Sequence, residues 1–316
     1  MAWRAGSVVT ATGDTAPVIL FIFNRAAATA RVFEAIRRAR PRHLYVCADG
    51  PRRDVPDDKA RCEEARRATE GVDWPCEITR IYSAANLGCT ASIERGLRSI
   101  FVRFDRAIVL EDDCVPDASF FTYCSELLER FAHEPKVFSV GASRPPGAAQ
   151  LEESYAFSRY PLIWGWATWR RAWQHYDGTM AAWPEVRARD DLRRILNDRR
   201  AEEYWSFIFE RHWQQPAVRS WDYCWMLSSW LADGLSIVPD RNLVSNIGFG
   251  VDAVNCSDPA IAGANLPVSP MPFPLRHPQA LARHAALDAS IERAQFSGTV
   301  TRVFGEARRR IAEAAR

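Results

Sequence analysis

Three consecutive carboxylic acids, Glu111, Asp112 and Asp113, stand directly after the apolar run of residues 107–110. Adjacent carboxylates repel one another, and a hard divalent cation such as Mg²⁺ or Mn²⁺ relieves that repulsion while bridging to the phosphates of a ligand. The alternative is a surface acidic turn that caps the following helix. Because the triplet ends a run that reads as a buried strand, we favour a metal site serving a phosphate-bearing ligand.

Polar residues follow the other early apolar runs in the same way. They are Asn24, Arg25, Asp49 and Asn86. Ligands of open α/β sheets bind at the carboxyl ends of the strands, so these side chains are expected on one rim with the acids. Arg25 could pair with phosphate or form a surface salt bridge. Asp49 could contact a nucleobase or ribose, or shape an Asp-Gly-Pro turn.

A sheet must position these residues, and the pattern up to residue 113 predicts one. Apolar strand-like runs alternate with helix-like segments, which is typical of a doubly wound α/β sheet. The expected strands are residues 18–23, 43–48, 76–82 and 107–110, and the expected helices are 29–40, 58–70 and 91–104. The first run is continuously apolar, which indicates a strand covered on both faces.

The regular alternation stops after residue 140. Helices are expected at 119–132, 190–197, 201–212, 222–233, 279–293 and 301–316, and strands at 137–140 and 235–239. Ten of the 12 tryptophans fall within residues 164–230, a density that marks a thick core or an aromatic binding surface.

Composition excludes several classes of protein. Lys and Arg total 41 against 39 Asp and Glu, and a net charge of +2 argues against a dedicated nucleic-acid binder. A hydrophobic fraction of 47% argues against disorder, and no run of apolar residues is long enough to span a membrane. The eight cysteines form no C-x-x-C pair and no export leader is visible, so we expect a cytoplasmic protein with reduced, buried thiols.

Four segments, in order, resemble one enzyme family. They are VILFIFNR from residue 18, LYVCADGPR from 44, NLGCTASIERGL from 86 and AIVLEDDCVPDASFF from 107. They resemble the nucleotide-diphospho-sugar transferase domain of GT-A fold glycosyltransferases, in particular the β-1,2-N-acetylglucosaminyltransferases and similar bacterial glycosyltransferases. The resemblance implies an α/β fold, a Rossmann-like doubly wound mixed sheet with helices on both faces. It also implies transfer of a sugar from a nucleotide-sugar, expected to be a UDP-sugar, to a glycan, lipid-linked or protein acceptor with inversion.

The resemblance assigns roles on the rim. Asp113 would be the main ligand of Mn²⁺ or Mg²⁺, and Glu111 and Asp112 would support the metal and the ribose. Asp49 would contact the base and Arg25 the nucleotide phosphates. Asn24 and Asn86 are also expected to contact the donor.

Shorter segments extend the resemblance over residues 17–255. Trp164, Gly165 and Trp166 resemble the Gly-Trp segment beside the donor sugar, and Asp222 lies where the family holds its general base. The alternative for Asp222 is the N-cap of the helix that follows. Tryptophans of these segments are expected to present ring faces to sugars, and the others to be core. The first group is Trp164, Trp166, Trp221 and Trp225, and the second is Trp169, Trp173, Trp205, Trp213 and Trp230.

The expected organisation is a loose tail (1–16), the transferase domain (17–255) and a Pro-rich wrap with C-terminal helices (256–316). The domain would comprise a nucleotide-binding half (17–115) and an acceptor half (116–255). The Arg-rich helix of residues 302–316 could lie on an anionic membrane surface or be a solvated tail.

Two other functions remain open. A sugar-nucleotidyltransferase of the same fold would need a Gly-rich loop after the first strand, where this chain has Asn24-Arg25 and three alanines. A non-catalytic glycan-binding module could use the tryptophans but has no need of the acidic triplet.

Overall fold

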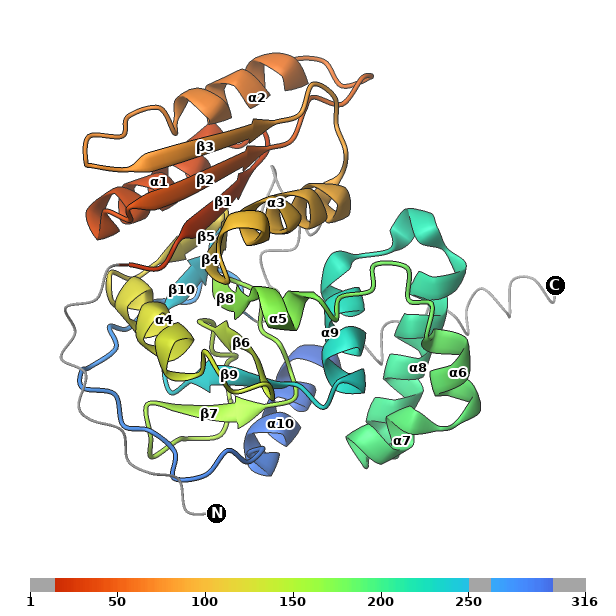
Figure 1. Cartoon of the computed structure of the whole chain (residues 1–316). Helices are drawn as coiled ribbons and strands as arrows, with labels where there is room; N and C mark the ends of the chain where they lie inside the picture. Colours follow the sequence, from red (N-terminus) through yellow and green to blue (C-terminus); the bar gives the residue numbers. More distant parts are fainter. Residues whose placement is uncertain (1–14, 250–262, 298–316) are drawn as a thin grey trace.

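The computed structural model describes residues 15–249 and 263–297. At its centre is an eight-stranded mixed sheet of order β3-β2-β1-β4-β8-β6-β9-β7, with helices packed on both faces (Figure 1). This confirms the predicted α/β class and the mixed sheet. A separate two-stranded ribbon pairs β5 with β10. The expected helix of residues 301–316, its membrane contact and most of the N-terminal tail lie outside the described residues.

The strands are β1 (Val18–Ile22), β2 (His43–Ala48), β3 (Glu77–Tyr82), β4 (Arg106–Glu111), β5 (Cys114–Pro116), β6 (Val137–Gly141), β7 (Tyr155–Ser158), β8 (Trp166–Trp169), β9 (Leu235–Pro239) and β10 (Val244–Asn246). The helices are α1 (Ala26–Ala39), α2 (Asp58–Arg67), α3 (Cys89–Arg103), α4 (Ser119–Arg130), α5 (Arg170–Trp173), α6 (Trp183–Ala188), α7 (Asp191–Leu196), α8 (Arg199–Gln214), α9 (Trp221–Leu231) and α10 (Ala285–Ile291). A 3₁₀ turn (Pro216–Val218) precedes α9, and a π-helical turn (Glu292–Ser297) follows α10. No described helix is long and apolar enough to cross a membrane.

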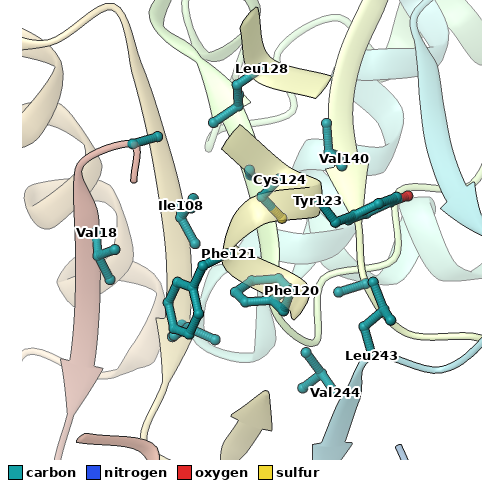
Figure 2. Packing of buried hydrophobic residues seen from close by; sticks show 14 of the residues in the cluster. Val18, Ile108, Phe120, Phe121, Tyr123, Cys124, Leu128, Val140, Leu243 and Val244 are labelled. Atoms are coloured by element: carbon teal, nitrogen blue, oxygen red, sulfur yellow. The ribbon is translucent and has the colours of Figure 1, made fainter. Parts of the chain in front are cut away.

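The strands β3, β2, β1 and β4 run parallel, as the alternation of strands and helices predicts. Every residue of β1 is buried. Val18 and Leu20 pack in the core formed with α1 and α4, whereas Ile19 and Phe21 pack in the core formed with α3. Figure 2 shows the first of these cores, where Phe121 of α4 lies on the side of Ile108 and Val18, and Tyr123 points toward Val140. Burial on both faces explains why this strand is apolar at every position.

The Trp-rich region of residues 164–230 contains one strand, β8, where only helices and loops were expected, and β7 lies just before it. β8 runs antiparallel between β4 and β6. All four residues of β8 are buried, so no polar alternation marks it as a strand. Trp166 points to the α3 core and Trp169 to the α4 core, which is the alternation expected across a sheet.

The ribbon of β5 and β10 was also not expected. It pairs Cys114 with Asn246 and so draws a late segment of the chain onto the end of the acidic triplet. Strands of three residues carry too little pattern to be recognised from sequence. The expected helix starts also shift slightly: α1 begins at Ala26 rather than residue 29, and α3 at Cys89 rather than residue 91.

The C-terminal helix α10 is fixed to the sheet by one buried carboxylate. Asp288 is 2% exposed and accepts hydrogen bonds from Ser158 Oγ (2.6 Å) and from the backbone N–H of Arg159 (3.1 Å). It also forms ion pairs with Arg159 Nε (3.2 Å) and Arg283 Nε (3.0 Å). A buried carboxylate with this many donors is stable only while all partners are present.

We predict that Asp288→Ala lowers the free energy of unfolding by about 3 kcal/mol, because it leaves a buried guanidinium without its partner. Urea denaturation measures the change. Asp233→Asn, which removes an exposed ion pair to Lys136 and tolerates the positive φ of this residue, should cost less than about 1 kcal/mol. Equal effects of the two substitutions would contradict this account.

Candidate functional site

A cavity of about 800 Å³, here called the main pocket, opens at the carboxyl ends of β1 and β4. Arg25, Glu111 and Asp113 line one side of it. Trp164 and Asp222 also line it, although they come from the second half of the chain. The structure therefore brings these five predicted site residues to one cavity.

Arg25 organises the acidic triplet. Its guanidinium forms ion pairs with Asp112 and with Asp113, the latter at 3.0 Å between Nη2 and Oδ2. Asp112 is 3% exposed and also accepts a hydrogen bond from the Phe23 backbone N–H at 3.1 Å. Asp112 is thus turned away from the pocket and holds Arg25, which in turn faces both the pocket and the acids. The salt bridge considered for Arg25 is formed, although within the site rather than on the open surface.

The negative charge of this cluster is not fully compensated, and this affects the pKa of Glu111. Burial raises its pKa, and the nearby carboxylates of Asp113 and Asp112 raise it further, against a smaller opposing effect of Arg25. One arginine therefore does not neutralise three acids. This is the local imbalance that a bound cation removes.

A backbone segment covers the acidic triplet. The N–H of Ile247 donates to the Asp113 carbonyl at 2.8 Å, and the Gly248 N–H donates to Asn246 Oδ1 at 2.8 Å. A Cβ on Gly248 would overlap the Asp113 carboxylate, so only glycine fits there without a shift. The ribbon of β5 and β10 explains this close approach.

The residues fit a divalent cation that is shared with a ligand. Carboxylate oxygens are the hard donors that Mg²⁺ and Mn²⁺ take, and Glu111 and Asp113 both present them to the pocket. Within the described part of the chain, no group of three or more His, Cys, Asp or Glu residues is placed to hold a metal by itself. Two carboxylates would leave the other coordination positions of such an ion to water or to a ligand.

Asp49 and Asn86 join two loops behind the pocket. The Asp49 carboxylate accepts from the backbone N–H groups of Gly50 (2.8 Å), Leu87 (2.8 Å) and Gly88 (3.0 Å). It also accepts from Asn86 Nδ2 at 2.9 Å. Neither side chain is among the described residues that line the main pocket. In this structure Asp49 takes the turn-forming alternative and fixes the entry to α3.

Asn24 supports a different contact. It is buried and donates from Nδ2 to Asp58 Oδ1 at 2.5 Å. Asp58 also accepts from Arg52, and that hydrogen bond holds the pKa of Asp58 well below its usual range. A second hollow of about 460 Å³, lined by Asn24, Arg25 and the first turn of α1, lies on this side of the arginine.

Asp222 is not an N-cap. Helix α9 begins at Trp221 with Ser220 as its N-cap, and the Ser220 hydroxyl donates to the Asp222 carboxylate. Asp222 lines the main pocket together with Ser220 and Trp221. The carboxylate is therefore held in the first turn of α9 and faces the cavity that also contains Asp113.

Two of the four tryptophans expected to face sugars are core residues. Trp166 is 1% exposed and Trp225 is fully buried, so neither ring offers a face to a ligand. They pack against one another with ring centroids 6.1 Å apart. Trp164 does line the pocket, and Trp221 lines it too although it is only 3% exposed.

Gly165 separates the two tryptophans of its segment. Its φ of +63° is unfavourable for residues with a Cβ, and a Cβ would collide with Val244. The glycine thus allows Trp164 to face the pocket while Trp166 enters the core.

Several pocket residues were not expected from the sequence. Because α3 begins at Cys89, its first turn lines the pocket with Thr90 and Ala91, and Glu94 follows one turn later. Arg219, from the loop before α9, also lines the pocket. The exposed Cys89 corrects the expectation that all thiols are buried. The sequence signal nearest to these residues was Asn86, which was expected on the rim just before this helix.

Comparisons with known proteins give a limited result. No protein-family model and no curated protein matches the chain. One similar solved structure is a UDP-glucose pyrophosphorylase complexed with UDP-glucose, with 10% identity and a TM-score of 0.31 over 51% of this chain and 78% of that one. A likeness of this size says nothing about activity, so the pocket itself must carry the functional interpretation.

We predict that Asp49→Asn destabilises the protein by about 1–3 kcal/mol, because an amide N–H₂ would face backbone N–H donors. Urea denaturation gives the stability, and calorimetry with UDP and Mg²⁺ gives the affinity. The exposed Asp54 provides the matched control, Asp54→Asn. Unchanged stability with a large loss of UDP affinity would instead indicate direct base contact.

Proposed function

We propose that this chain is a metal-dependent glycosyltransferase that moves a sugar from a nucleotide-sugar, a UDP-sugar in our proposal, to a carbohydrate, lipid-linked or protein acceptor with inversion. The observation that carries the proposal is the main pocket. It places Arg25 and the carboxylates of Glu111 and Asp113 in the same cavity as the separate carboxylate of Asp222.

The charge balance of the pocket supports a cation-dependent donor. Four carboxylates line it, and the arginines that do so are Arg25 and Arg219. Arg25 is already paired with acids, and Arg219 donates to backbone carbonyls, including that of His212 at 3.0 Å. A diphosphate would enter against a negative wall unless a cation accompanied it. When bound, the metal would be held by Asp113 and Glu111 and would stabilise negative charge on the leaving diphosphate.

The chain's own groups can hold the rest of the donor. Arg25 is close enough to the acids to contact a phosphate placed beside them. The first turn of α3 presents backbone N–H groups that lack helical partners, and the helix dipole favours an anion at this end. Trp164 offers an aromatic face to the apolar side of a sugar ring.

Asp222 would act as the general base. The acceptor hydroxyl transfers its proton to the Asp222 carboxylate as its oxygen forms a bond to the anomeric carbon. The bond from that carbon to the diphosphate oxygen breaks, and the electron pair leaves with the diphosphate. Attack from the face opposite the leaving group inverts the anomeric centre. The Ser220 hydroxyl donates to Asp222 and so orients the carboxylate.

Two structural features disfavour the other functions. Helix α1 begins at Ala26, only four residues after β1 ends, and this leaves no glycine loop to wrap a triphosphate. Burial of Trp166 and Trp225 removes much of the aromatic surface that a glycan-binding module would use.

We predict that Asp222→Asn lowers kcat by about 10² or more, which is the contribution of a positioned general base. Its affinity for UDP in the presence of Mn²⁺ should stay the same. Asp113→Asn should instead abolish the Mn²⁺-dependent part of UDP binding. Calorimetry with UDP and turnover assays with a panel of UDP-sugars measure these effects, with Asp54→Asn as the control.

The outcomes separate the alternatives. Absence of UDP binding to the wild-type protein in Mn²⁺, together with tight binding of oligosaccharides, would support a glycan-binding module. Identical UDP binding by the wild type and Asp113→Asn would contradict the metal site.

A further inference from the structure

One carboxylate of the main pocket has no part in donor binding or proton transfer. Glu94 projects from α3, one turn beyond the residues that face the phosphates, and lines the same cavity as Asp222. It forms no ion pair within the described residues. A partly buried carboxylate needs hydrogen-bond donors to replace those that water would supply.

A tyrosine fixes the position of Glu94. The Tyr176 hydroxyl donates to Glu94 Oε1 at 2.8 Å, and the Tyr176 ring stacks on Trp173 with centroids 4.2 Å apart and planes 8° apart. Burial raises the pKa of Tyr176, and the neighbouring Cys224 and Glu94 raise it further. The hydroxyl therefore remains a proton donor to the carboxylate.

The backbone beside Glu94 is also fixed. A Cβ on Gly178 would overlap Glu94 Oε1, so glycine permits the close approach of this loop. Arg219 Nη1 donates to the Gly178 carbonyl at 3.1 Å, and the Arg219 carbonyl accepts from Thr90 Oγ1 at 3.2 Å. Thr90 and Glu94 share α3, so the loop before α9 and the Gly178 loop are tied to the same helix.

Glu94 and Asp222 lie near the same groups. The charge of each raises the pKa of Tyr176 and of Cys224. Glu94 Oε1 is occupied by Tyr176, whereas Oε2 has no hydrogen-bond partner among the described residues. This leaves a rigidly held acceptor of hydrogen bonds on the side of the pocket that contains the proposed base.

We propose that Glu94 binds hydroxyl groups of the acceptor sugar and so selects which hydroxyl reaches Asp222. This inference rests on the proposed glycosyltransferase function. A carboxylate accepts strong, charge-assisted hydrogen bonds from sugar hydroxyls. With two carboxylates on this side, an acceptor bearing its own negative charge would be repelled. The ligand class is therefore a neutral carbohydrate with free hydroxyls.

A shallower hollow gives a longer acceptor room to extend. It has a volume of about 400 Å³ and runs from Ala91 and Glu94 along the exposed face of α3 to Val102. A glycan whose terminal sugar contacts Glu94 could leave the main pocket along this helix.

The test uses the full chain saturated with UDP and Mg²⁺, and titrates methyl glycosides of glucose, galactose, mannose and N-acetylglucosamine by saturation-transfer NMR. We expect at least one glycoside to bind the wild type and to bind Glu94→Gln about tenfold more weakly, with UDP affinity unchanged. Tyr176→Phe, which keeps the ring, should weaken the same glycoside less. The exposed Glu63 gives the control Glu63→Gln, which should bind like the wild type.

Charge discrimination provides a second readout. The wild type should bind the methyl glycoside of glucuronic acid more weakly than the methyl glycoside of glucose. In Glu94→Gln the two affinities should be closer to each other. If Glu94 had a purely structural role, Glu94→Gln would lower the free energy of unfolding without changing the ratio of these two affinities.

Equal glycoside affinity in the wild type and Glu94→Gln, or UDP binding with no neutral glycoside bound, would overturn the inference about Glu94. Failure of UDP to bind the wild type would instead overturn the proposed function, so the two failures are distinguishable.

Discussion

The ion pairs of Arg25 with Asp112 and Asp113 are the constraint on which the pocket depends. They join the end of β1 to the end of β4, and the Phe23 backbone adds a hydrogen bond to the same carboxylate. Removal of Arg25 would leave two largely buried carboxylates without their cation, which is far more costly than the loss of a surface pair. The two ion pairs of Arg25 therefore stabilise the rim and also determine which carboxylates remain exposed to the pocket.

Around this rim, the chain uses polar side chains mainly to fix backbone. Asp49 accepts hydrogen bonds from three N–H groups of the adjacent loops, and Arg219 donates to the carbonyls of His212 and Gly178. These contacts leave Glu111, Asp113, Asp222 and Glu94 as the carboxylates presented to the cavity. Asp49 thus fixes loops without lining the main pocket, whereas Arg219 both fixes loops and lines it.

The sequence was most informative where burial imposes a long pattern. The continuous apolarity of β1 and the alternation of strand-like and helix-like segments up to residue 113 correctly indicated a parallel sheet covered on both faces. Its strand ends correctly located Arg25 and Asp113 on one rim. The short strands β5, β8 and β10 were missed because three or four residues are too few to show a period. For the same reason Trp166 was wrongly assigned to a sugar cleft. The strand that places it in the core, β8, was not recognised.

Side-chain partners were harder to predict than positions. Nothing in the sequence shows that Tyr176 would hold Glu94, because the two residues come from separate elements that meet only in the folded chain. Asp222 was located by its neighbours in sequence, but its capping alternative could be decided only by the start of α9.

The stack of Trp166 on Trp221, with centroids 5.6 Å apart and planes 21° apart, links a strand of the sheet directly to the first turn of α9. β8 is in turn paired with β4, which ends at the acidic triplet. The separation between Asp113 and Asp222 is thus set by packed aromatic rings rather than by a flexible hinge. In the proposed reaction, a donor and an acceptor bound between Asp113 and Asp222 would meet carboxylates that folding has already fixed in position.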